Sequence, residues 1–181
     1  NQAALESRQA VELLRMCLDA GYDRAQTLTA VNGMMLLAGQ GERFTTVDLF
    51  LLDLWTGKAS LDKLGAAGSY LMQSEGLSLL GGDALPLGIL ENVESGEKLM
   101  QLHQGDTLIL LSDGVEDAYE NRQSMEETIR DALTLETAQD AANAILTGAP
   151  SGDSAPADDQ TVLVLRLIRA RADAKIEEMY Q

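Results

Sequence analysis

The sequence is poor in the side chains on which many hydrolytic and zinc sites depend, because its 181 residues include one cysteine and one histidine. A single cysteine, Cys17, excludes a disulfide within the chain and fits a reducing compartment. A serine or cysteine triad would have to use His103, which lies in a turn-like segment, and a zinc site of the Cys/His type lacks its ligands. The sequence also has no phosphate-binding loop ending in GKS or GKT. Carboxylates are therefore the candidate catalytic groups.

Positive charge and long hydrophobic runs are also scarce. The 13 Lys and Arg residues stand against 29 Asp and Glu residues, which gives a net charge of −16. Such a charge repels nucleic acid phosphates and anionic lipid, so we expect neither as a partner. No apolar run approaches the roughly 20 residues of a membrane-spanning helix, and the polar residues 1–8 do not form a signal peptide. We expect a cytoplasmic domain, with any membrane tether of the parent protein lying outside it.

Hydropathy patterns predict one α+β domain over residues 1–181. Residues 3–20 have the apolar spacing of an amphipathic helix, and Asp23 can cap a second helix to about residue 37, so residues 1–40 are expected to form a helical hairpin. Short apolar runs separated by tight turns favour antiparallel strands, because parallel crossovers need a dozen or more residues. The expected architecture is two packed, mainly antiparallel sheets with helices outside.

The expected elements after the hairpin are as follows. Strands are predicted at residues 45–55, 58–64, 77–80, 97–102, 107–112 and 161–168, with the last two buried. Helices are predicted from residue 124, where Ser124 and Glu127 have the spacing of a capping box, and over residues 136–146. A mobile loop is expected at residues 147–157 and a charged helix or tail at residues 169–181.

Two acidic motifs stand at the ends of apolar strands. Asp113 and Gly114 follow the strand 107–112, and Asp158 and Asp159 precede the strand 161–168. If these strands are antiparallel neighbours, the exit of one lies beside the entrance of the other, and the carboxylates meet at one end of a sheet. Adjacent carboxylates repel unless a cation lies between them, and Mg²⁺ or Mn²⁺ suits such a site, which the backbone of Gly114 could approach closely. Each motif alone is also compatible with a simple turn or loop cap.

Seven short motifs occur in an order that resembles the phosphatase domain of stage II sporulation protein E, within the type-2C metal-dependent protein phosphatases. The motifs are residues 6–8 (ESR), 44–48 (FTTVD), 63–69 (KLGAAGS), 85–89 (LPLGI), 105–108 (GDTL), 112–115 (SDGV) and 158–162 (DDQTV). The resemblance implies a four-layer αββα sandwich and a centre of two Mn²⁺ or Mg²⁺ ions that hydrolyses phosphoserine or phosphothreonine in proteins. It implies that Asp113 and Asp158 are metal ligands and that Asp159 and Lys63 support the site.

The resemblance also sets expectations for the parent protein. The family's bridging aspartate lies at a strand end just before the first helix, and residues 1–181 begin after that position. We therefore expect these residues to lack an N-terminal strand and one of three carboxylates, and to bind metal weakly and be inactive in isolation, whereas the parent is active. The implied substrate is a phosphorylated anti-anti-sigma-like protein in sporulation or stress regulation. The implied role of the hairpin is that of a switch or homodimer element.

Two alternatives to a phosphatase stay open. The first is a catalytically inactive, phosphatase-like module that binds a partner protein through the helical hairpin. The second is another Mg²⁺-dependent hydrolase, such as a nuclease, which the net charge of −16 disfavours.

Overall fold

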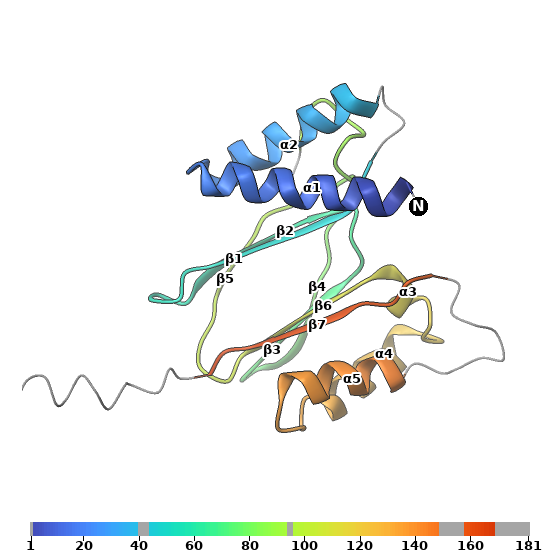
Figure 1. Ribbon diagram of the computed structural model, residues 1–181. Helices are drawn as coiled ribbons and strands as arrows, with labels where there is room; N and C mark the ends of the chain where they lie inside the picture. Colours follow the sequence, from blue (N-terminus) through green and yellow to red (C-terminus); the bar gives the residue numbers. More distant parts are fainter. Residues whose placement is uncertain (1, 40–43, 94–95, 149–157, 169–181) are drawn as a thin grey trace, which may run out of the picture.

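The structure, a computed structural model, describes residues 2–39, 44–93, 96–148 and 158–168. Figure 1 shows four layers, which are α1 with α2, a first sheet, a second sheet, and α4 with α5. The helices are α1 (Gln2–Asp19), α2 (Arg24–Gly39), α3 (Asp113–Glu116), α4 (Arg122–Ala132) and α5 (Ala138–Gly148). The strands are β1 (Val47–Leu52), β2 (Lys58–Leu64), β3 (Ser69–Gln73), β4 (Gly76–Leu80), β5 (Lys98–Gln101), β6 (Thr107–Leu111) and β7 (Val162–Arg166). The predicted four-layer α+β sandwich is confirmed.

The hairpin of α1 and α2 covers one face of the first sheet (Figure 1). Leu14 and Cys17 of α1 are buried, and Gly21, with a φ of +85°, ends the turn after this helix. Asp23 caps α2, because its carboxylate accepts a hydrogen bond of 2.8 Å from the backbone N–H of Gln26. Both predicted helices and the predicted cap are therefore present. The apolar faces of the hairpin and the first sheet share one cluster, which includes Ala10, Leu28, Val31, Met35, Val47, Leu49 and Leu64.

The two sheets are antiparallel throughout the described strands. The first sheet has the order β1-β2-β5, and the second has the order β4-β3-β6-β7. Ala59, Leu71 and Leu102 form a buried cluster between them. β3 is absent from the predicted strands, because its apolar run, residues 70–72 between Ser69 and Gln73, is too short to distinguish strand from helix.

The turn between β1 and β2 is tightly held and carries exposed apolar side chains. The predicted strand 45–55 ends at Leu52, three residues earlier than predicted. The carboxylate of Asp53 closes a turn there, because it accepts hydrogen bonds from the backbone N–H groups of Trp55 (2.8 Å) and Thr56 (3.2 Å). The side chain of Thr56 and these two N–H groups lower the pKa of the Asp53 carboxyl below its usual value. Leu54 is 86% exposed and Trp55 is 98% exposed. The tip is thus ordered but projects its apolar side chains into solvent.

The two strands predicted to be buried differ from each other in the structure. β6 lies between β3 and β7, and its residues Leu108, Ile109 and Leu111 are buried as predicted. β7 lies at the edge of the described sheet, and its Leu163 is 54% exposed. The prediction of a buried strand over residues 161–168 is therefore wrong, because an apolar run indicates a strand but not its place in the sheet.

The later helices begin at caps that were not among the predicted ones. α4 is capped by Asn121, whose side-chain oxygen accepts a 3.0 Å hydrogen bond from the N–H of Ser124, so the predicted cap at Ser124 is wrong. The N–H of Asp140 donates to the hydroxyl of Thr137 over 3.0 Å at the start of α5. Most of the predicted loop (149–157) and the predicted tail (169–181) lie outside the described residues. No helix in the described part of the chain is long and apolar enough to cross a membrane.

Candidate metal centre

The pairing of β6 with β7 decides where the two acidic motifs lie. The strands are antiparallel neighbours, with Leu111 opposite Val162 at the end of the ladder. The pairing continues by one bond, because the backbone N–H of Ser112 donates to the carbonyl oxygen of Thr161 over 3.0 Å. Asp113 lies two residues after the end of β6, and Asp158 lies four residues before the start of β7. The two predicted acids are therefore at the same end of the second sheet, as their proposed pairing requires.

Side-chain hydrogen bonds tie the two segments together beyond the ladder. The hydroxyl of Ser112 donates to the carbonyl oxygen of Asp159 (3.2 Å) and accepts from the N–H of Thr161 (2.9 Å). The side-chain amide of Gln160 donates to the carbonyl oxygen of Gly114 (3.0 Å). These three bonds fix the start of α3 against the residues that precede β7. Ser112 and Gln160 are not among the predicted site residues, although both lie inside the motifs that predicted the site.

Gly114 lies where the two segments come closest. A Cβ atom added to Gly114 would lie 2.6 Å from the carbonyl oxygen of Asp159 and 3.3 Å from the carbonyl carbon of Asp158. Real Cβ atoms do not approach backbone oxygen so closely, so a side chain at this position would push the two segments apart. The absence of a side chain at Gly114 therefore allows the acidic motifs to meet.

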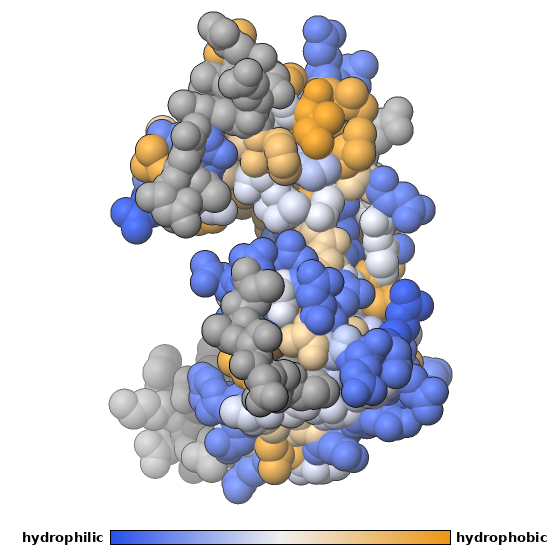
Figure 2. All heavy atoms as spheres, turned by 90° about the vertical axis from the view of Figure 1, so that its right-hand side faces the viewer, coloured by the Kyte–Doolittle hydropathy of each residue, from blue (hydrophilic) through white to orange (hydrophobic). Residues whose placement is uncertain are grey.

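The carboxylates at this end are accessible and oriented by backbone N–H groups. The side chains of Asp113 and Asp158 are exposed. The N–H of Gly114 donates to the carboxylate of Asp113 (3.0 Å), and the N–H of Asp159 donates to that of Asp158 (2.8 Å). Each carboxylate keeps further lone pairs for a cation. Figure 2 views the α3 end of the molecule and shows a notch between its upper and lower parts, beside which the lower surface is largely hydrophilic.

This donor set suits a hard divalent cation. Mg²⁺ and Mn²⁺ prefer carboxylate and carbonyl oxygens, which Asp113, Asp158 and the backbone around Gly114 offer. Within the described ranges, no group of three or more His, Cys, Asp or Glu side chains is placed to hold a metal ion. The described carboxylates at this end could therefore supply only part of a coordination sphere, and a bound ion would take its other ligands from water or from other protein groups.

Lys63, predicted to support the site, belongs to a buried ionic cluster between the sheets. Its side chain is 1% exposed, and its ammonium contacts both carboxylate oxygens of Asp48 (2.7 and 2.9 Å) and the hydroxyl of Ser69 (2.9 Å). Asp48 is in β1, Lys63 in β2 and Ser69 at the start of β3. The cluster therefore joins the first sheet to the second and does not contact Asp113 directly.

One acidic residue near the site was not predicted. Glu116, three residues after Asp113 on α3, accepts a 3.2 Å hydrogen bond from the backbone N–H of Gly68 in the loop between β2 and β3. The sequence gives a weak signal for such a role, namely a carboxylate one helical turn after the predicted ligand.

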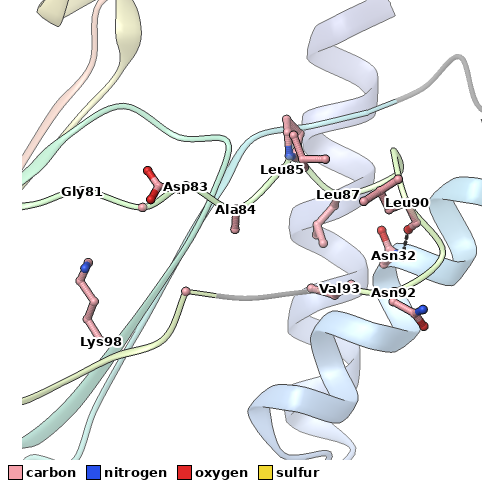
Figure 3. Close-up of a pocket in the computed structure, with 13 residues that line it drawn as sticks. Asn32, Gly81, Asp83, Ala84, Leu85, Leu87, Leu90, Asn92, Val93 and Lys98 are labelled. Atoms are coloured by element: carbon pink, nitrogen blue, oxygen red, sulfur yellow. Dashed lines mark hydrogen bonds between the residues drawn. The ribbon is translucent and has the colours of Figure 1, made fainter.

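A cavity of about 660 Å³ lies elsewhere, beside α2 and the loop after β4 (Figure 3). Asn32 of α2 fixes this loop, because its amide donates to the carbonyl oxygen of Leu90 (2.8 Å) and its oxygen accepts from the N–H of Gly88 (2.8 Å). Asp83 and Lys98 are the charged residues of its wall. Neither predicted acidic motif lines the cavity, which is therefore separate from the candidate metal centre.

Comparison with known proteins identifies the family and the fold of the chain. A family model described as stage II sporulation protein E matches residues 1–168. The chain belongs to the stage II sporulation protein E family. The stage II sporulation protein E of Priestia megaterium is 29% identical over 114 residues, which cover 63% of this chain and 20% of that protein. The chain thus spans about a fifth of the length of this relative.

Solved structures extend the likeness to the whole fold. The PP2C phosphatase domain of SpoIIE from Bacillus subtilis, solved with a fragment of its regulatory domain, has a TM-score of 0.74 and 25% identity, over 90% of this chain and 50% of that chain. The catalytic domain of the serine/threonine phosphatase PstP, in complex with 2 manganese ions, has a TM-score of 0.70 and 19% identity, over 92% and 82% of the two chains. The predicted stage II sporulation protein E-type phosphatase domain is therefore confirmed in family and in fold, and divalent metal dependence is general among such domains.

Proposed function

We propose that the protein is a metal-dependent serine/threonine phosphatase that hydrolyses phosphoserine or phosphothreonine on a small regulatory protein. The observation that carries this proposal is the end of the β6–β7 ladder, where Asp113 and Asp158 emerge side by side around Gly114. Two carboxylates placed together favour a divalent cation, because their repulsion is relieved when the cation binds. The family match and the fold of the phosphatase domains support the same reaction.

Each residue of the proposed site has a separate task. Asp113 and Asp158 bind Mn²⁺ or Mg²⁺, and Gly114 admits its backbone to the site because it has no side chain. Asp159 orients Asp158, since its N–H holds the neighbouring carboxylate over 2.8 Å. Ions held by Asp113 and Asp158 would supply an activated water for attack on phosphorus and would neutralise the phosphoryl oxygens. Lys63 supports the site from a distance by fixing the strands around it.

The proposed substrate is a phosphorylated anti-anti-sigma-like protein in the regulation of a sigma factor during sporulation or stress. This choice follows from the family, and a net charge of −16 is consistent with a protein substrate rather than nucleic acid or anionic lipid. We place the domain in the cytoplasm, with any membrane tether of the parent protein outside residues 1–181.

We further propose that residues 1–181 alone bind metal weakly and that the helical hairpin pairs with a second copy of the chain. The first proposal is supported by the described residues, among which no group of three or more His, Cys, Asp or Glu side chains is placed to hold a metal ion. The second is supported by apolar side chains of α1 and α2 that face solvent, namely Leu5, Val11, Met16, Met34 and Leu37.

The proposal is tested by manganese-dependent dephosphorylation of a phosphoserine protein by the intact parent. Asp113→Asn should lower kcat/KM by at least about 10²-fold, because removing a metal ligand removes the activation of water. Asp117→Asn, at an exposed acid four residues later, is the matched control and should keep the rate. Equal rates for the Asp113→Asn variant and the wild type would remove Asp113 from the mechanism. An inactive parent that still binds a partner protein through its hairpin would favour the binding module.

A further inference from the structure

The loop between β2 and β3 links the first sheet to the α3 end of the second sheet. β2 ends at Leu64 in the first sheet and β3 begins at Ser69 in the second, so residues 65–68 cross from one sheet to the other. The start of the loop is fixed, because the N–H of Gly65 donates to the carbonyl oxygen of Ala84 over 2.8 Å. Gly65 has a φ of +66°, and a Cβ there would lie 2.3 Å from Cγ of Pro86. A loop held this closely has a defined path.

The end of the loop is fixed by the cluster of Lys63, Asp48 and Ser69. The ammonium of Lys63 has three N–H donors, and it has three acceptor contacts in this cluster, which are the two carboxylate oxygens of Asp48 and the hydroxyl of Ser69. The hydroxyl of Ser69 in turn donates to Asp48 over 3.3 Å. A buried ammonium without these partners is strongly unfavourable, so the cluster holds Ser69 in one position.

The residue before Ser69 makes the contact with α3. The N–H of Gly68 donates to the carboxylate of Glu116 over 3.2 Å. A Cβ at Gly68 would lie 3.0 Å from Cδ1 of Leu79 and 3.8 Å from Oε1 of Glu116, so the loop backbone passes close to both side chains. The half-buried carboxylate of Glu116 thus accepts a hydrogen bond from Gly68, and the next residue, Ser69, is held by Lys63.

α3 has little internal support of its own. It has four residues, and within the described part of the chain its N-cap Ser112 makes no side-chain cap hydrogen bond. Helices this short are marginal without tertiary contacts, because nucleation fixes several residues for few hydrogen bonds. The contacts of Gly114 with residues 158–160 hold the first turn, and the bond of Glu116 to Gly68 holds the last residue.

We infer that Glu116 is a positioning residue for the metal centre. Its hydrogen bond to Gly68 holds α3, and therefore Asp113, against the β2–β3 loop. The cluster of Lys63, Asp48 and Ser69 in turn fixes that loop. This inference rests on the proposed function, because the orientation of Asp113 matters most when it binds a cation. When a group that orients a metal ligand without touching the metal is removed, the metal affinity typically falls about 10- to 100-fold. The bond needs an acceptor at residue 116 but no negative charge, so glutamine can replace glutamate.

The test compares four variants of the intact parent protein by calorimetric titration with Mn²⁺ alone. Glu116→Ala should raise the Kd for Mn²⁺ about tenfold. Glu116→Gln should stay within about twofold of wild type, because its amide oxygen accepts the same bond. Glu120→Gln is the matched control, an exposed glutamate four residues later, and should bind as wild type. Asp113→Asn should abolish binding at its site.

A second readout needs no metal. Hydrogen exchange in the metal-free protein should accelerate at Gly68 and in α3 for Glu116→Ala, and should be unchanged for Glu116→Gln. An unchanged Kd for Glu116→Ala, while Asp113→Asn loses binding, would overturn the inference and leave the proposed function intact. If Glu116→Gln loses as much Mn²⁺ affinity as Glu116→Ala, the inference is also overturned, because the charge of residue 116 and not its hydrogen bond would then determine the affinity. Wild-type binding by Asp113→Asn would overturn the proposed function and the inference together.

Discussion

The buried ion pair between Lys63 and Asp48 gives the sharpest prediction for stability. Lys63→Met keeps the length of the side chain but removes the ammonium, which leaves the carboxylate of Asp48 without its partner between the sheets. Breaking a buried pair costs about 3–5 kcal/mol, and because the Asp48 side chain is 13% exposed we expect the lower end, about 3 kcal/mol. For a domain of this size that loss lowers the melting temperature by about 6–12 °C.

The measurement is urea denaturation followed by far-ultraviolet circular dichroism. Lys58→Met is the matched control, since it makes the same change at an exposed lysine of the same strand and should shift stability by less than about 0.5 kcal/mol. The double variant Asp48→Leu/Lys63→Met should recover most of the loss, because replacing both charges with apolar groups leaves no unpaired ion. A loss below about 1 kcal/mol in Lys63→Met, or a double variant less stable than the single one, would refute the reasoning.

Three further predictions concern other parts of the molecule. Gly114→Ala should abolish Mn²⁺ binding in a calorimetric titration, because its Cβ would lie 2.6 Å from the carbonyl oxygen of Asp159, whereas Gly33→Ala, in open space on α2, should not change binding. Leu37→Glu, at an 87% exposed position, should shift the chain toward monomer in sedimentation velocity, and Leu99→Glu on β5 should not. Burial raises the pKa of Tyr70 to about 12, from about 10 in the unfolded chain. The stability that Tyr70 contributes is therefore complete below pH 10 and declines between about pH 10 and 12, a decline that urea titrations of Tyr70→Phe should lack.

The sequence predicted the features that depend on local patterns. The apolar spacing of Leu14 and Cys17 and the cap at Asp23 involve residues close together in sequence. Both helices of the hairpin were therefore predicted correctly. The meeting of the acidic motifs was also predictable, because Asp113 follows one apolar run and Asp158 precedes another, and antiparallel pairing brings such ends together.

What the sequence did not predict depends on partners far away in the chain. The place of β7 at the edge of the described sheet is decided by which strands pair with it, so the exposure of Leu163 is not visible in its own run of residues. Glu116 has a role only because the loop carrying Gly68 passes beside α3, 48 residues away in sequence. Asn121 displaced Ser124 as a cap, since several polar residues in a row can each start the same helix.

The ordered tip of the β1–β2 turn has a practical consequence for spectroscopy. Trp55 is the single tryptophan of the chain, and it is in water in the native state as it would be in the unfolded state. Its emission wavelength should therefore stay nearly constant while the core melts, so fluorescence is a poor monitor of unfolding for this protein. A blue shift of that emission in the native protein would instead report that an apolar surface has covered the indole.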